Sequence, residues 1–421
     1  MAFLNNANVL TRIISGILTS KAIAVFIGAE GLALIGNLRN FFASTQSLAT
    51  LGVYNGVVKY ISKFKNDSLE LSKTISTTFY LGYFMTCFLA FVLYLNAESV
   101  NLFIFPSYNY TYVIKILALA LPFYSLNMFC FSILNGFSKY KIMLLINILG
   151  QILGLLVTLI LIWQNTLDGA LISVVVSPSL IFLITLVAIV NQRSLFSVII
   201  ARNIDYKILK KLVPYAIMAI VTAIALPIVF IVIRNYIGAT IGLKEAGYWE
   251  AMSRVSTYYL MFINSLLALY ILPKFAKIHD IDEFVKEVKE VYKVIVPIMV
   301  AGMIIIYLAK TLIIKGVFSD EFLPTEGLFL WQLIGDFIKV LCVILTYQFL
   351  ARKMFWHFII IEVFFLIQMY LLSILCIDKF GIEGVTIAHC ISYAVQFCIL
   401  LLIFSNSQFR LVFENDLNNE I

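Results

Sequence analysis

The sequence predicts an all-α polytopic membrane protein, with about twelve transmembrane helices in two six-helix lobes that surround a central cavity as parallel repeats. Three observations support this fold class. The chain of 421 residues is 62% hydrophobic and only 13% charged. Its lysines and arginines collect in alternate loops between the apolar runs. Recognisable short motifs recur about half a chain apart.

The composition excludes a soluble enzyme. The mean hydropathy is +1.00, and an ordinary soluble domain has about 25% charged residues, roughly twice the share found here. A soluble protein of this length has no way to enclose so much apolar surface. The net charge of +7 fits an excess of cytoplasmic lysine and arginine in a membrane protein. We therefore expect the lipid bilayer, and no nucleic acid, as a partner.

Twelve apolar runs are each long enough to cross a bilayer, which takes roughly 20 residues. The first two carry many Ser, Thr, Asn and charged residues, so we expect them to face the bundle interior or a hydrated cavity. The spans are expected at about 8–34, 40–60, 74–95, 113–135, 141–163, 168–191, 210–234, 247–272, 292–314, 327–350, 355–377 and 383–404.

The distribution of basic residues predicts the orientation. Twenty of the 30 lysines and arginines lie in one set of loops or near the termini, against six in the opposite loops. Cytoplasmic loops carry the excess of Lys and Arg. Both termini are therefore expected in the cytoplasm, and an even number of spans agrees with this, since it places both termini on the same side.

Landmarks in the two halves recur at nearly one offset. Lys59-Tyr60 and Lys274-Phe275 end the second and eighth spans, and Asp168-Gly169 and Glu383-Gly384 open the sixth and twelfth. Both pairs share the same offset in the numbering, close to half the length of the chain. Lys139 and Arg352 lie in corresponding short loops at nearly that offset. We therefore predict an N-terminal six-helix lobe over 1–200 and a C-terminal six-helix lobe over 201–421.

Two spans of the second half carry polar stripes with helical spacing. Glu250, Ser253, Arg254 and Thr257 lie on one helix face, and Gln332, Gly335, Asp336 and Lys339 repeat that spacing. Ionisable groups inside a bilayer have to be paired, hydrated or near a span end. The stripes therefore line a hydrophilic cavity, or the ion pairs Glu250–Arg254 and Asp336–Lys339 hold helices together, and both readings can be true at once.

Candidate cations outnumber candidate anions in the spans and at their ends, which favours an anionic substrate such as a phosphate or pyrophosphate. Simpler roles stay open for three residues: Lys59 and Arg234 as interfacial anchors, and Glu362 as a hydrogen-bond partner instead of a proton carrier. The predicted substrate-binding residues are Lys21, Arg39, Lys59, Arg234, Arg254 and Lys339, and the predicted cavity acids, candidates for ion coupling, are Glu250, Asp336 and Glu362.

Several motifs of enzymes and metalloproteins are missing. The sequence has no G-x-x-x-x-G-K-[ST] loop, no H-E-x-x-H and no G-x-S-x-G. The three histidines are scattered, and the six cysteines form no C-x-x-C pair. We therefore predict a transporter with no catalytic residues, no metal and no cofactor.

Motifs along the whole chain carry a family resemblance. The chain resembles the Wzx family of bacterial lipid-linked oligosaccharide flippases, within the multidrug/oligosaccharidyl-lipid/polysaccharide exporter superfamily. The resemblance is to O-antigen translocases and to the related flippase for enterobacterial common antigen. The matching stretches are Gly36-Asn37-Leu38-Arg39, Tyr54-Asn55-Gly56-Val57-Val58-Lys59-Tyr60, Leu226-Pro227, Arg234-Asn235, Gly247-Tyr248-Trp249, Tyr270-Ile271-Leu272-Pro273, Trp331-Gln332-Leu333-Ile334-Gly335-Asp336-Phe337-Ile338-Lys339 and Glu362-Val363.

The resemblance implies transfer of an undecaprenyl-pyrophosphate-linked oligosaccharide, with the O-antigen repeat unit as first choice, to the periplasmic leaflet of the bacterial inner membrane by alternating access. It implies an O-antigen polymerase and a chain-length regulator as partners. The alternatives are a flippase for the enterobacterial common antigen intermediate and a drug or cation exporter of the same superfamily. An integral-membrane glycan polymerase or ligase is a third class, and it requires essential residues in outer loops.

Overall fold

The computed structural model describes residues 2–50, 57–58, 60–61, 64, 67–190, 205–267, 271–275, 278, 281–351 and 354–405. These residues form long helices, and no strand occurs among them. The chain divides into two compact units, Met1–Asn235 and Tyr236–Ile421. The predicted lobe boundary between residues 200 and 201 lies outside the described residues and stays a prediction.

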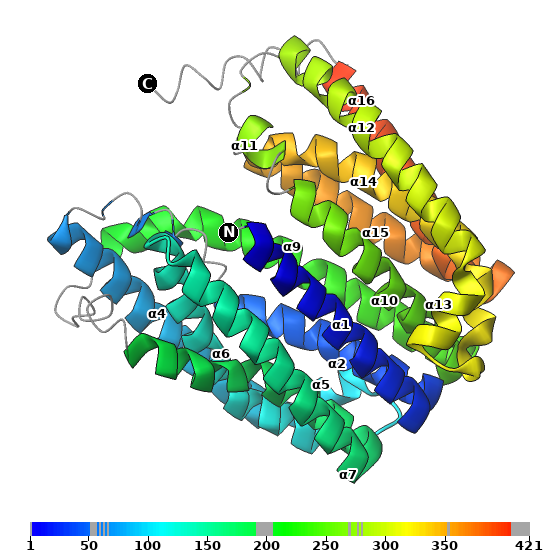
Figure 1. Cartoon of the computed structure of the whole chain (residues 1–421), viewed down its shortest axis with the longest axis horizontal. Coiled ribbons are helices and arrows are strands. Elements are labelled where there is room, and N and C mark those ends of the chain that lie inside the picture. Colours follow the sequence, from blue (N-terminus) through cyan, green and yellow to red (C-terminus); the bar gives the residue numbers. More distant parts are fainter. Residues whose placement is uncertain are drawn as a thin grey trace. The chain divides into compact units, whose positions relative to one another are not determined.

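Within the first unit, α6 packs on α7 and α4, and α1 packs on α7. Figure 1 shows these helices in blue to green. The helices are α1 (Ala2–Phe26), α2 (Gly28–Ala49), α4 (Ser68–Leu95), α5 (Ala97–Ile104), α6 (Thr111–Gly136), α7 (Tyr140–Val190) and α9 (Tyr206–Thr240), the last of which ends beyond the unit boundary.

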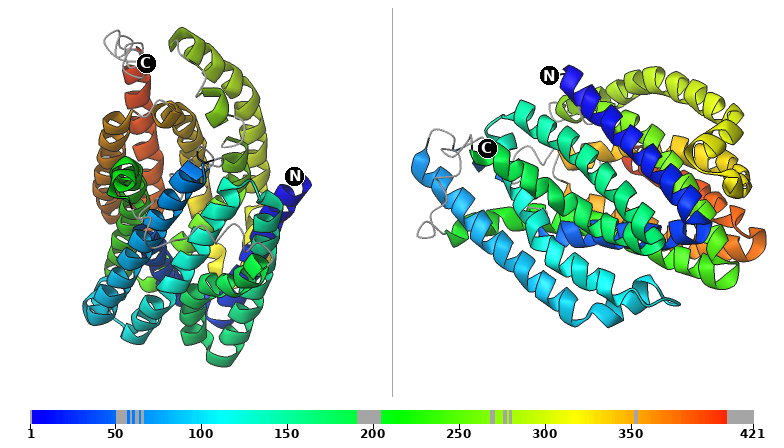
Figure 2. Two further views of the ribbon diagram at one scale, coloured as in Figure 1. Left: turned by 90° about the vertical axis from the view of Figure 1, so that its left-hand side faces the viewer. Right: turned by 60° about the horizontal axis from the view of Figure 1, so that its bottom comes forward.

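Within the second unit, α14 and α15 both pack against α16, and Figure 2 shows the long helices from two further sides. Contacts between Asp336 and His389, and further along between Cys342 and Tyr393, show that α14 and α16 run parallel. The elements are α10 (Leu243–Leu266), α11 (Leu272–Phe275), α12 (Ile281–Leu308), α13 (Lys310–Val317), the 3-10 helix η3 (Asp320–Leu328), α14 (Phe329–Ala351), α15 (Phe355–Phe380) and α16 (Glu383–Ser405).

The expected polytopic fold is confirmed. Among the described residues, nine helical stretches are long and apolar enough to cross a membrane. One of them is α7, which contains non-helical residues at Asn165 and Thr166 and so consists of two helices, as the expected spans 141–163 and 168–191 require. Counting these two separately, and adding the more polar α2 and α10, gives the expected twelve.

The first expected boundary is wrong. The sequence places the break between residues 34 and 40, but α1 ends at Phe26 and α2 begins at Gly28. Gly28 has a φ of +84°, a left-handed conformation that glycine adopts without the penalty a Cβ brings. The residues on both sides of Gly28, from Ala22 to Ile35, are apolar apart from Glu30. Hydropathy alone therefore gives little sign of this turn.

The helix bounds repeat along the chain and confirm the internal duplication. The starts of α2 and α10 are separated by the same offset as the starts of α7 and α15, and this offset is the one that the sequence landmarks share. The short helices α5 and α13, which sequence analysis missed, are equal in length and begin at nearly the same separation. In the second half α15 and α16 correspond to the two parts of α7. Each half therefore uses the same order of helices.

Candidate functional site

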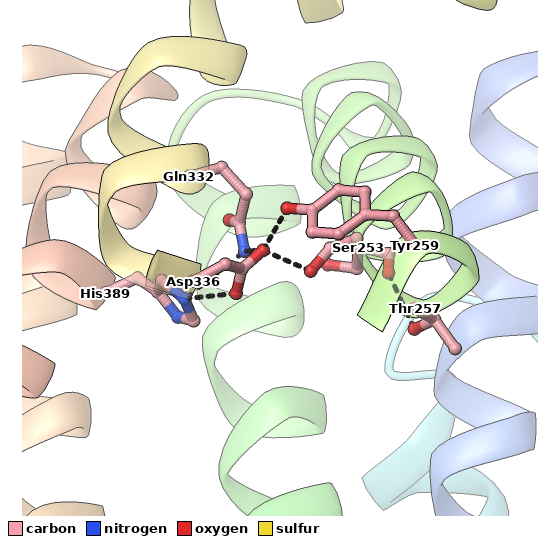
Figure 3. Close-up of polar contacts among 7 residues, drawn as sticks. Ser253, Thr257, Tyr259, Gln332, Asp336 and His389 are labelled. Atoms are coloured by element: carbon pink, nitrogen blue, oxygen red, sulfur yellow. Dashed lines mark hydrogen bonds and ion pairs between the residues drawn. The ribbon is translucent and has the colours of Figure 1, made fainter. Parts of the chain in front are cut away.

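The carboxylate of Asp336 is the centre of a buried polar cluster in the second unit, and it is fully enclosed. Its Oδ1 lies 3.0 Å from Nε2 of His389 on α16. Its Oδ2 accepts hydrogen bonds from Nε2 of Gln332 at 3.2 Å and from the hydroxyls of Ser256 and Tyr259 on α10. Figure 3 shows Gln332, His389 and Tyr259 around the carboxylate. One side chain therefore links α10, α14 and α16.

Helical spacing and one glycine produce this cluster. Gln332 and Asp336 are four residues apart on α14, so they lie on one face of that helix. Gly335 lets α16 approach, because a Cβ at this position would lie 3.1 Å from Cα of Cys390 and would overlap the imidazole of His389. Buried polar groups need hydrogen-bond partners, and the cluster supplies them to a carboxylate surrounded by apolar helices.

The stripe on α10 is organised around an ion pair. Nε of Arg254 lies 3.0 Å from Oε1 of Glu250, and both side chains are buried. Thr257 is exposed and donates to the backbone oxygen of Ser253 at 2.8 Å. The Glu250–Arg254 ion pair, which the sequence offered as an alternative to cavity lining, is thus formed. This ion pair does not exclude a role of Arg254 in substrate binding.

The second ion pair considered from the sequence, Asp336 with Lys339, is not formed. Asp336 instead contacts His389, and Nζ of Lys339 lies over the ring of Tyr393, 5.6 Å from its centroid. Lys339 still interacts electrostatically with Asp336 and with Glu362. Glu362, on α15, is half-buried. The charge of Lys339 therefore acts on both acids, Asp336 and Glu362.

Three of the predicted cations in the first unit have different surroundings. Arg234 is 1% exposed, and its Nη1 donates to Oδ1 of Asn37 at 2.8 Å. Lys21 is half-buried and Arg39 is exposed. Lys59 lies outside the described residues. Of the three, Lys21 and Arg39 are the more accessible.

Sequence analysis missed His389, Ser256 and Tyr259 as members of the Asp336 cluster. Ser256 and Tyr259 lie beside the polar stripe of α10, on the face that turns to α14. His389 is far from Asp336 along the chain, and the sequence shows it only as one of three scattered histidines. A histidine within an apolar span was the one available signal, because such a residue needs a polar partner. Among the described residues, no three His, Cys, Asp or Glu side chains gather as a metal site would require.

Comparison with known proteins finds similarity along most of the chain. The model of the family described as "Polysaccharide biosynthesis protein" matches residues 23–326. Proteins named lipid III flippase from Escherichia coli (strain K12) and from Shigella flexneri are each 24% identical to the chain over 398 residues. These alignments cover 94% of the chain and 96% of each relative.

Solved transporter structures share the fold. An inward-facing multidrug resistance MATE family transporter of the MOP superfamily matches with a TM-score of 0.80 at 14% identity, over 94% of each chain. The lipid II flippase MurJ, in an inward closed conformation, matches with a TM-score of 0.70 at 17% identity, over 99% of this chain and 91% of that one.

These relatives are named as flippases and transporters, in agreement with the prediction of a transporter and not an enzyme. The family match and the two curated relatives confirm the resemblance to Wzx-type flippases that the motifs indicate. Because the family model covers well over half of its length, the chain belongs to the polysaccharide biosynthesis protein family of polytopic membrane proteins.

Proposed function

We propose that the protein is a flippase that moves an undecaprenyl-pyrophosphate-linked oligosaccharide from the cytoplasmic to the periplasmic leaflet of the inner membrane. The observation that carries the proposal is the match to two lipid III flippases over nearly the full length of both chains. For this reason the intermediate of enterobacterial common antigen, lipid III, is the preferred substrate. An O-antigen unit, the first choice from sequence, becomes the second candidate.

The physical problem is to carry a polar headgroup across about 30 Å of hydrocarbon. Cationic side chains offset the free energy lost when a pyrophosphate leaves water. We assign this role to Lys21, Arg39, Lys59, Arg234, Arg254 and Lys339, with Glu250, Asp336 and Glu362 as the acids that balance them. The exposure of Arg39 and the partial exposure of Lys21 and Lys339 support this role for these three. The termini are proposed to lie in the cytoplasm.

The substrate is tested by expressing the chain in two strains, one without its lipid III flippase and one without its O-unit flippase. Surface glycan and unflipped lipid-linked intermediate are measured in both. We expect rescue of the first strain only. Rescue of the second strain alone assigns the O-antigen unit instead. Failure in both, together with drug resistance conferred on a sensitive host, favours an exporter of the same superfamily.

The charge assignment is tested in the rescued strain with Lys339→Ala and Arg39→Ala. Both variants should let unflipped intermediate accumulate while the protein remains abundant in the membrane. Lys315→Ala is the matched control, since Lys315 is an exposed lysine that lies 3.4 Å from Asp320 near the end of α13. Equal rescue by all three variants contradicts the assignment.

A further inference from the structure

We propose that Asp336 and His389 form a proton-binding site that is loaded and unloaded once in each transport cycle. The proposal rests on the proposed function as a flippase, and it adds an energy source to it. Its starting point is the contact of a fully enclosed carboxylate with a buried imidazole, at 3.0 Å between Oδ1 and Nε2.

The hydrogen bonds decide which member of the pair takes up the proton. Oδ2 of Asp336 accepts from three donors, the Gln332 amide and the hydroxyls of Ser256 and Tyr259, and these bonds stabilise the ionised carboxylate. The exchanged proton therefore binds to His389. Imidazole is the side chain that ordinarily changes its charge between about pH 5 and pH 8.

The position of Gln332 favours one tautomer of His389. Its Nε2 lies 3.2 Å from Oδ2 of Asp336 and 3.3 Å from Nε2 of His389. When Nε2 of His389 carries the hydrogen directed at Asp336, the Gln332 amide donates to the carboxylate. An incoming proton then forms an N–H bond at Nδ1, and the imidazole becomes an imidazolium beside an unchanged carboxylate. On release that bond breaks and the proton passes to water.

Other charged and titratable groups lie on the helices around the Asp336–His389 pair. On α10, Glu250 and Arg254 compensate each other. Lys339 on α14 interacts electrostatically with Asp336 and with Glu362 on α15. Further titratable groups on the elements packed against the cluster include Tyr259 on α10, Cys390 and Tyr393 on α16, Lys274 on α11, Tyr292 on α12, and Asp320, Glu321 and Glu326 on η3.

Proton occupancy changes the net charge of the Asp336–His389 pair between −1 and zero. An uncompensated charge inside a protein or a bilayer costs several kcal/mol. The structure encloses Asp336 completely and leaves His389 only 6% exposed. Protonation of His389 thus favours a conformation in which the cluster is enclosed. Loss of that proton favours a conformation that opens the cluster to water. Because the cluster links α10 to α14 and α16, loading is coupled to their arrangement.

Nuclear magnetic resonance on the full-length protein tests the proton site directly. The chain has three histidines, His279, His357 and His389. With isotope-labelled histidine, the signal of His389 is assigned by elimination through His279→Gln and His357→Gln. We expect this signal to change from imidazole to imidazolium between about pH 9 and pH 5. A signal that does not change over this range overturns the proposal.

If Asp336 and His389 are paired, the carboxylate of Asp336 must influence proton binding by the imidazole of His389. In Asp336→Asn the ring should bind the proton more weakly, because the facing negative charge is gone. Ser256→Ala is the matched control, since it removes a hydrogen bond to the same carboxylate and no charge. An equal titration of His389 in the wild type and in Asp336→Asn contradicts the pairing.

Flipping in proteoliposomes tests the coupling. With purified lipid-linked oligosaccharide, a gradient of one pH unit should change the wild-type rate by up to about tenfold, the factor by which proton activity differs. His389→Gln should flip at a rate that does not respond to the gradient, whereas His357→Gln should respond as the wild type does. A rate that responds to sodium and not to pH in the wild type refutes proton coupling while the flippase assignment survives. Absence of flipping with an intact His389 titration refutes the proposed function alone.

Discussion

Gly169 and Gly384 occupy equivalent positions in the two halves of the chain. A Cβ on Gly169 would overlap the carbonyl oxygen of Leu161, and a Cβ on Gly384 would overlap that of Cys376. In both cases the carbonyl belongs to the residue eight positions earlier. The reversal between two consecutive helices is therefore built in the same way in α7 and between α15 and α16, and it requires a residue without a side chain.

Replacement of either glycine by alanine should destabilise the protein. The added methyl group would collide with a backbone carbonyl, which has no alternative rotamer and does not move away easily. We therefore expect each change to lower the free energy of unfolding by about 1–3 kcal/mol, as overpacking does. Thermal unfolding in detergent measures this. Gly154→Ala is the control, because its Cβ would lie 3.6 Å from the Cβ of Ser177, an ordinary contact. If Gly169→Ala unfolds at the same temperature as Gly154→Ala, the inferred close approach is wrong.

Gly335 should be equally sensitive, with a consequence for the Asp336 cluster. In Gly335→Ala the added methyl group meets the imidazole of His389 and lies 3.1 Å from Cα of Cys390. We expect loss of stability by about 1–3 kcal/mol and a perturbed His389 resonance. Gly302→Ala on α12 is the matched control, because its Cβ would meet no atom within 4 Å. There the higher helix propensity of alanine, worth about 1 kcal/mol, should stabilise the helix.

In the first unit, Asn37 joins α2, α5 and α9. Its Nδ2 donates to the Oδ1 of Asn235 at 2.7 Å and to the backbone oxygen of Ile104 at 3.0 Å, while its Oδ1 accepts from Arg234. Asn37→Ala removes a partner of a buried guanidinium, so we expect a loss of about 2 kcal/mol in unfolding free energy. Asn96→Ala is the control. Asn96 is exposed and its side chain donates to the backbone oxygen of Val92, so this change should alter stability by less than about 0.5 kcal/mol.

The sequence predicts the features that depend on local pattern. Apolar runs predict the helices, and the offset of Asp168 and Glu383 predicts the duplication that the helix bounds confirm. Features that arise from contacts between distant residues escaped prediction. His389 contacts Asp336 only because α16 packs on α14. The residues next to His389 in the sequence do not indicate this partner. The turn at Gly28 escaped because a left-handed glycine leaves the hydropathy of its neighbours unchanged.

The Glu250–Arg254 pair gives a test that separates structure from substrate binding. Removing one partner of a buried ion pair leaves a buried charge and destabilises by about 3–5 kcal/mol, whereas replacing both by apolar or neutral residues of similar size is often neutral. Glu250→Gln and Arg254→Met should therefore each lower the unfolding temperature. The double variant should recover most of it. The exposed pair Glu290 and Lys293 is the control, since its removal should have little effect.

Flipping by the stable double variant then decides the role of Arg254. If Arg254 contributes positive charge to the pyrophosphate site, the double variant should accumulate unflipped lipid-linked intermediate although it is folded and abundant. If the pair serves only to hold α10 in place, the double variant should restore surface glycan to the wild-type level. The measurement is the ratio of unflipped to surface glycan at matched protein abundance. Only an unflipped excess supports Arg254 as a substrate-binding residue, because the stability of the double variant removes misfolding as its cause.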